Sequence, residues 1–126
     1  MTSTVIVKMN VCSKTHTVKV SMRDDGDLDV HIESDCRNVQ EYARRLTKMT
    51  VGDATDFCNS VVVAPDVRAP LSTTCLCPMG VLSAAWKELG MVSRSICSKA
   101  HSNEVIMDVF DERCVERHAI DDAHRS

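Results

Sequence analysis

The chain has 126 residues, enough for one domain with its own hydrophobic core. Hydrophobic residues make up 44% of it and aromatic residues only 3%, so aliphatic side chains must form most of that core. The formal net charge is -3 and the Lys and Arg residues are scattered, which excludes the basic stripe of a nucleic-acid binder. No apolar run is long enough to span a bilayer and the first residues do not resemble a secretory signal, so we expect a cytoplasmic protein with neither a membrane nor a nucleic-acid partner.

The first third of the chain alternates between apolar and polar residues, which is typical of strands with one buried face. Three strands are predicted there, over residues 5–11, 16–22 and 28–32. Asp25 and Gly26 separate the second strand from the third and are residues that favour a tight reversal. The three strands together predict an antiparallel β-meander.

From Arg37 onward the apolar residues follow helical spacing. An amphipathic helix is predicted over 37–48, a weaker one over 51–58 with Val51, Ala54 and Phe57 inward, and a strong one from Pro78 to a C-terminal cap at Gly90. On the last helix we expect an inward-facing side that includes Trp86. Each helix would lay its apolar side on the meander.

The remaining segments are weaker in pattern. Residues 60–70 indicate a short apolar strand or an extended link, and Val105, Met107 and Val109 indicate a final strand. Residues 111–126 are polar and are predicted to form a flexible tail. The predicted fold class is therefore α+β, with an antiparallel β-meander packed against two main α-helices in a single small domain of residues 1–110.

Seven cysteines are a high number for such a chain, and the odd total fits a disulfide framework poorly. Cys36 directly precedes the first strong helix, and Cys77 directly precedes Pro78 at the start of the last one. The free N–H groups and the dipole of a helix N-terminus favour a negatively charged thiolate, which is the form that attacks substrates and binds metals. The sequence therefore predicts that both thiols ionise readily.

Cys12 ends the first strand, at the sheet end where Cys36 follows the third. Cys75 and Cys77 would face the same way in an extended segment, because strand side chains repeat every two residues. We expect Cys12, Cys36 and Cys75 to converge at one end of the sheet within one metal coordination shell. Cys77 would be either a fourth ligand or a cap of its helix. Less central candidates for the same shell are Cys58 and Asp35.

No grouping of residues indicates a catalytic site. The chain has no Gly-rich phosphate loop, no paired carboxylates and no arrangement that resembles a catalytic triad. His31 lies on the polar face of a strand, and His16 on an inward face where a hydrogen-bonded histidine is expected. No catalytic residue is predicted, and the sequence favours a binding protein over an enzyme.

Three segments carry a resemblance to a known family: MNVCSK, ESDCRNVQEYARRL and CLCPMGVLSAAWKELG. Together they resemble an uncharacterised family of small cysteine-containing proteins of anaerobic prokaryotes, a domain of unknown function. That family has a Cys-Gly, a Ser-Asp-Cys and a Cys-x-x-Pro, which correspond here to Cys12, to Cys36 and to Cys75 with Pro78. Ser13 stands where the family has Gly, and Cys77 is an additional cysteine. The order of elements is also distantly similar to iron–sulfur scaffold proteins of the NifU and IscU type, which implies a transiently held cluster.

The function that these residues favour is binding of a metal ion or an iron–sulfur cluster by cysteine thiolates, in a carrier or scaffold. Soft thiolate donors select zinc or an iron–sulfur cluster, and other proteins of metal or sulfur metabolism would be the partners. Two alternatives remain open. The protein would otherwise perform thiol or persulfide chemistry with Cys36 or Cys75 as the nucleophile, or be a structural or interaction module whose cysteines are inert core residues.

Overall fold

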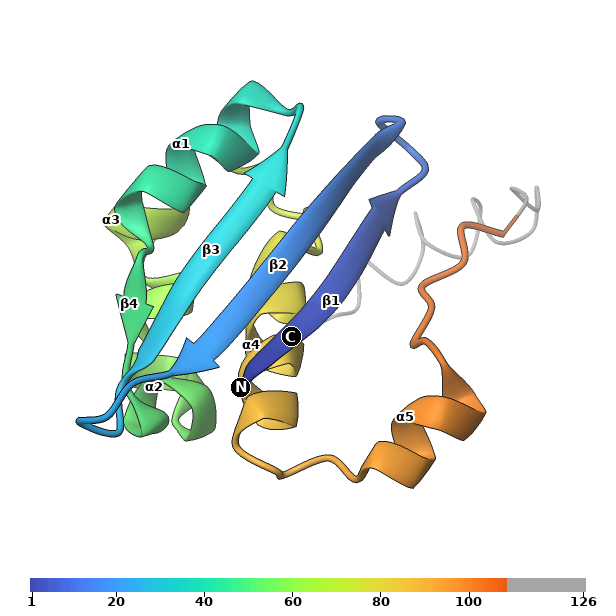
Figure 1. The fold of residues 1–126 in the computed structure, drawn as a ribbon. Helices are drawn as coiled ribbons and strands as arrows, with labels where there is room; N and C mark the ends of the chain where they lie inside the picture. Colours follow the sequence, from blue (N-terminus) through green and yellow to red (C-terminus); the bar gives the residue numbers. More distant parts are fainter. Residues whose placement is uncertain (109–126) are drawn as a thin grey trace, which may run out of the picture.

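The computed structural model describes residues 1–108, so the predicted tail over 111–126 lies outside it. Within the described part, strands form one antiparallel sheet in the order β1-β2-β3-β4. Their bounds are Thr2–Met9, Lys14–Met22, Leu28–Ser34 and Lys48–Met49. Helix α4 (Cys77–Glu88) packs across β1 and β2, and α1 (Arg37–Arg45) packs beside β3 (Figure 1). The α+β class and the antiparallel meander are confirmed.

Shorter elements connect the two main helices and follow the second one. They are α2 (Val51–Thr55), the 3-10 turns η1 (Phe57–Asn59) and η2 (Val61–Val63), α3 (Pro65–Arg68) and α5 (Arg94–Ala100). The strand or link expected over residues 60–70 is wrong, because Pro65 starts a helical turn at a position where proline needs no N–H partner. Among residues 1–108 no helix is long and apolar enough to cross a bilayer.

Two predicted strand segments are not strands. Val11 lies in the turn between β1 and β2, and its side chain is exposed. Val105 and Met107 are also exposed, in a stretch without regular structure, and Val109 lies outside the described residues. Alternating apolar residues form a strand only where a neighbouring strand completes their hydrogen bonds. No apolar periodicity predicts helix α5. The helix begins where the Ser93 hydroxyl accepts a hydrogen bond from the Ile96 N–H.

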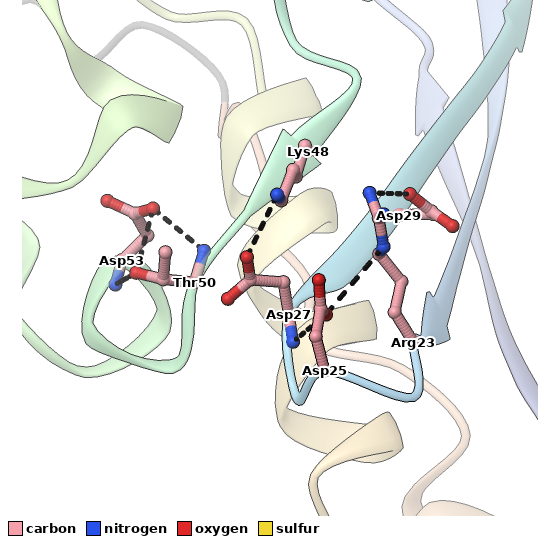
Figure 2. Close-up of polar contacts among 7 residues, drawn as sticks. All are labelled: Arg23, Asp25, Asp27, Asp29, Lys48, Thr50 and Asp53. Atoms are coloured by element: carbon pink, nitrogen blue, oxygen red, sulfur yellow. Dashed lines mark hydrogen bonds and ion pairs between the residues drawn. The ribbon is translucent and has the colours of Figure 1, made fainter.

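Helix α1 ends three residues before the predicted position 48, because the chain turns there to add the two-residue strand β4 to β3. The Val30 N–H donates to the Thr47 carbonyl over 2.9 Å and continues this pairing. Figure 2 shows the polar contacts around the β2–β3 turn, among them the 3.0 Å ion pair between Lys48 and Asp27 that joins this turn to β4. Such exposed pairs contribute little free energy. The pairing of β4 therefore depends mainly on burial of Met49.

The weaker predicted helix also differs from its expected shape. Thr50 and Asp53 form a reciprocal capping box at the start of α2, which then ends after one turn. Ala54 is buried as expected, but Val51 and Phe57 are exposed rather than inward. The helix is too short to bury a full apolar stripe.

Helix α4 contacts the sheet through residues along its whole length. At its first turns Gly80 lies so close to β1 that an added Cβ would be 2.3 Å from Cγ2 of Val7. At its last turn the buried Glu88 carboxylate accepts hydrogen bonds from the Ser3 hydroxyl at 2.9 Å and the Met22 N–H at 3.0 Å. These contacts fix the orientation of α4, and with it the position of Cys77 at its N-terminus.

Trp86 differs from its predicted inward position, since its side chain remains 40% exposed. Its indole N–H donates to the Ala54 carbonyl over 2.7 Å and so links α4 to α2. The polar end of the ring therefore determines its position at the margin of the core.

Substitution of Gly80 by Ala tests the close approach of α4 to β1. We expect a loss of about 1–3 kcal/mol from overpacking against Val7, partly offset by the gain in helix propensity of about 1 kcal/mol. Urea unfolding measures the change. The matched control is Gly52→Ala, where the nearest atom to the added Cβ is at an ordinary 3.5 Å and no loss is expected.

The double variant of Val7→Ala and Gly80→Ala completes a mutant cycle. It should lose less free energy of unfolding than the sum of the two single changes, because the smaller side chain at position 7 leaves room for the new methyl group. Additive losses would contradict the close contact.

Candidate functional site

Cys12 lies in the turn of residues 10–13 that joins β1 to β2, and it is exposed. The last strand pair before this turn is Met9 with Lys14. The Cys12 thiol donates a long hydrogen bond of 3.7 Å to the Met9 carbonyl. Ser13 has a φ of 57°, a left-handed conformation that favours glycine. The turn therefore has a strained backbone at the residue next to the thiol.

Cys36 is the N-cap residue of α1 and is half-buried, at the start of the helix where the sequence places it. Its backbone N–H donates to the Ser34 hydroxyl oxygen over 2.9 Å. The same oxygen lies 2.6 Å from Nδ1 of His16, a side chain that is only 1% exposed. A buried histidine and a serine thus hold the backbone of Cys36 in place.

The strand register brings the segments of Cys12 and Cys36 to the same end of the sheet. His16 of β2 is the pairing partner of Ser34 of β3. The Cys12 turn precedes β2 and Cys36 follows β3, so both lie just beyond this pair. An ion pair of 3.7 Å between Lys14 and Asp35 also joins the two segments. The two cysteines therefore occupy neighbouring positions at this end.

His16 is neutral in its buried position. Burial lowers its pKa, and the negative charge of Asp35 opposes this effect. A neutral imidazole has one acceptor and one donor nitrogen, so Nδ1 either accepts from the Ser34 hydroxyl or donates to its oxygen, which also receives the Cys36 N–H. The sequence placed His16 on an inward strand face, but only the register shows that it supports the segment of a cysteine.

Cys77 is the first residue of α4 and is completely buried, with Leu76 as the N-cap. Burial raises the pKa of its thiol to about 12, and the charges of Cys75 and Cys36 act in the same direction. The expectation that this thiol ionises readily is therefore wrong. The loss of hydration outweighs the helix dipole, which contributes at most about 2 kcal/mol at a helix end.

Cys75 is half-buried in the segment before α4. Burial raises the pKa of its thiol, the N–H of Cys77 opposes the rise, and the charges of Cys36 and Cys12 add to it. These influences reach across three separate segments of the chain. The strand register and these influences place Cys12, Cys36, Cys75 and Cys77 at one end of the sheet, and we call these four residues the thiol site.

Tyr42 of α1 borders the inner side of the thiol site. Its ring is fully buried, and its hydroxyl donates to the Val62 carbonyl over 2.8 Å. Burial raises the pKa of this hydroxyl, and the charges of Cys77 and Cys75 raise it further, whereas the charge of Arg68 lowers it. Tyr42 follows the helical spacing of apolar residues after Arg37, a pattern that carries no signal for a place beside the cysteines.

The thiol site is not a finished metal centre in this conformation. Within residues 1–108, no group of three or more His, Cys, Asp or Glu side chains is arranged to hold a metal ion. The expected single coordination shell is thus not preformed, although the donors lie in the same region. A metal would require the side chains of the site to move towards one another.

The two less central candidates lie apart from the four cysteines in different ways. Cys58 is exposed on η1, and neither Cys75 nor Cys77 has a pKa influenced by it. Asp35 lies next to Cys36, but its side chain is 70% exposed and pairs with Lys14. Cys97 is half-buried on α5, and Cys114 lies outside the described residues.

Comparison with known proteins identifies a family and nothing more specific. A sequence profile described as a family of unknown function, DUF6951, matches residues 3–100. No curated protein and no solved structure matches the chain. The resemblance to an uncharacterised family is confirmed, while the distant likeness to NifU and IscU scaffolds has no support.

The buried Cys77 thiol predicts how the metal-free, reduced protein responds to alkaline pH. An unfolded chain ionises its cysteines near the ordinary value of 9.0, whereas the folded protein keeps Cys77 protonated up to about 12. Between these values the unfolded state binds fewer protons, so the stability of the fold falls as the pH rises. We expect a loss of about 1 kcal/mol per pH unit from this thiol.

Urea unfolding at about pH 8 and about pH 10 measures this loss. Cys77→Val removes the ionisable group from the same buried volume and should reduce the pH dependence. Cys58→Val is the control at an exposed position and should leave it unchanged. Equal pH dependence in the wild-type and Cys77→Val proteins would show that Cys77 ionises without a burial penalty.

Proposed function

This chain belongs to the DUF6951 family of unknown function, and from its own thiol site we propose that it binds a thiophilic metal ion or an iron–sulfur cluster. The observation that supports the proposal is the placement of Cys12 and Cys36 at one end of the sheet, with Cys75 and Cys77 close enough for the charge of Cys36 to raise their pKa values. Four thiolate sulfurs are the donor set of many zinc and iron–sulfur sites. The protein would then act as a metal or cluster carrier or scaffold.

The charge state of two of the thiols supports this function. Burial raises the pKa of Cys75 and Cys77, and the charges of neighbouring thiols add to the rise, so the metal-free protein holds these two thiols protonated. A bound cation removes that repulsion and displaces the protons. A bound metal would therefore convert Cys75 and Cys77 from neutral thiols to thiolates.

The same surroundings disfavour the nucleophile alternative. A nucleophilic cysteine needs a lowered pKa or an adjacent base, and burial raises the pKa of Cys75, one of the two cysteines considered for that role. The inert-core alternative explains the fully buried Cys77. It does not explain why two half-buried thiols, Cys36 and Cys75, are close enough for their charges to raise the pKa of Cys77.

A metal would have to close the site, because no ready coordination shell exists among the described side chains. Cys36 and Cys75 are half-buried and Cys12 is exposed, so their side chains have room for a change of rotamer. The fit of the site to a metal therefore rests on the chemistry and number of its donors. A cytoplasmic location and partners in metal or sulfur metabolism belong to the same proposal, since free thiols persist in reducing compartments.

Purification without oxygen, followed by elemental analysis and a visible spectrum, tests the proposal. We expect bound zinc or iron in the isolated protein, or sulfur-to-metal charge-transfer bands after addition of Co²⁺ or after iron and sulfide reconstitution. Single Ser substitutions at Cys12, Cys36 and Cys75 should each lower the metal affinity by about tenfold or more.

Cys58→Ser is the matched control, because it changes an exposed cysteine outside the thiol site. It should leave the metal content and the spectrum unchanged. If the wild-type protein binds neither Co²⁺, zinc nor a reconstituted cluster, the proposal is wrong. If Cys58→Ser weakens binding as much as Cys36→Ser does, the ligands have been assigned wrongly.

A further inference from the structure

Strand β1 forms one edge of the sheet, because within residues 1–108 its only neighbouring strand is β2. It is eight residues long and contains neither proline nor glycine. Its register with β2 advances one residue at a time from Thr2 to Met9, so no β-bulge bends the strand away. Proteins commonly protect an edge with prolines, bulges or short strands. The β1 edge has none of these and can therefore pair with another strand.

The hydrogen bonds of the sheet show which backbone groups of β1 point outward. The Val30 N–H donates to the Thr47 carbonyl, so the backbone groups of Val30 face away from β2. Those of its partner Val20 therefore face β1 and bond to Ser3, because residues of an antiparallel ladder alternate between the two directions. By the same alternation, the outward-facing residues of β1 are Thr2, Thr4, Ile6 and Lys8.

One of these outward groups already has a partner from outside the sheet. The Lys87 ammonium of α4 donates to the Thr4 carbonyl over 2.9 Å, as the direction of that carbonyl requires. This contact brings a positive charge to the edge in addition to that of Lys8, and β1 contains no acidic residue. The β1 edge therefore combines outward backbone groups with positive charge.

The C-terminal segment of residues 104–109, EVIMDV, has complementary properties. Val105, Ile106 and Met107 are 67%, 77% and 68% exposed and belong to no helix or strand. Consecutive β-branched and apolar residues of this kind favour a strand. The segment also contains two acidic residues, Glu104 and Asp108, and no basic one. It is a strand pattern of negative charge, and the edge is a strand of positive charge.

We propose that two copies of this chain exchange their C-terminal segments, so that residues 104–109 of each copy add as a strand to the β1 edge of the other. Main-chain hydrogen bonds to the outward groups of β1 supply the affinity, as in other complexes formed by strand addition. The exchange is reciprocal about a two-fold axis, so the assembly closes as a dimer. The occupant is a second copy because residues 101–108 run apart from their own β1 (Figure 1). The dimer does not depend on the thiol site.

The inner side of the added strand matches the margin of the core. Val5 and Met9 of β1 face the core but are only partly buried. Side chains of a strand alternate between its two sides, so Val105, Met107 and Val109 lie on the same side. In the dimer these three side chains cover the margin at β1 and remove apolar surface of both copies from water.

The outer side of the added strand matches the outer face of the sheet. Ile106 and Asp108 lie on this side, opposite to Val105 and Met107. On the outer face of β1, Ile6 is exposed and Lys8 carries a positive charge. Apolar and opposite-charge pairs between neighbouring strands stabilise a sheet. Both sides of the segment therefore find matching side chains on β1.

Gel filtration with light scattering, in the presence of a reducing agent, measures the mass of the wild-type protein from about 1 μM to about 1 mM. We expect a shift from monomer to dimer within this range. Hydrogen exchange adds a local measurement, because the amides of Ile6 and Lys8 should exchange more slowly in the dimer than in the diluted monomer. A protein that stays monomeric throughout overturns the inference. Slow exchange of these amides in such a monomer would assign the segment to its own β1.

A proline in the segment tests whether this segment is the occupant of the edge. Met107→Pro removes a backbone N–H that the added strand needs and should raise the dissociation constant of the dimer at least about tenfold. The thermal midpoint of the monomer should not change, because Met107 is exposed and lies outside any helix or strand. Asn103→Pro is the matched control before the segment and should leave the dimer intact. If Met107→Pro dimerises like the wild type, the copies meet through another surface and the inference is wrong.

Charge reversal tests the electrostatic match separately. Lys8→Glu places a negative charge on the edge and should weaken the dimer about fivefold. Addition of Asp108→Lys to Lys8→Glu should restore the affinity, because the charges are then exchanged between edge and segment. Lys99→Glu on α5 makes the same change in net charge and should have no effect of this size. A double variant that dimerises no better than Lys8→Glu alone would contradict the pairing of the segment with β1.

Discussion

The contact between Gly80 of α4 and Val7 of β1 is the constraint on which the arrangement of the site depends. No side chain beyond a hydrogen atom fits between helix and strand there without a shift of Val7. The contact sets the first turn of α4 directly above the β1–β2 pair of Val7 and His16. Because Cys77 begins that helix and Cys75 precedes it, both lie at the end of the sheet where Cys12 and Cys36 are found.

Much of the fold follows from local sequence pattern, and the exceptions have identifiable causes. Alternation along β1, β2 and β3 and helical spacing along α1 and α4 are repeated signals, and all of these elements are present. The strand β4 has two residues and exists only because β3 offers free backbone groups, so no periodicity reveals it. The exposed alternation at Val105 and Met107 is the converse case, a strand pattern without a partner strand.

The sequence predicts the relative position of Cys12 and Cys36 but not the surroundings of the cysteines. Antiparallel strands return the chain to the same end, so the proximity of Cys12 and Cys36 follows from element order alone. Element order does not predict the charge state of Cys77. That charge state depends on how completely the start of α4 is buried, and burial has a larger effect on the pKa than the dipole at the helix N-terminus. The support of Cys36 by Ser34 and His16 depends on strand register, which the sequence pattern does not specify to a single residue.

Burial connects the electrostatics of the thiol site to the stability of the fold. Protonated thiols allow the fold to keep Cys75 and Cys77 in low-hydration surroundings without unpaired charge. A metal that bound only the folded site would add its binding free energy to the stability of the domain, which otherwise depends on the packing of α4 against the sheet.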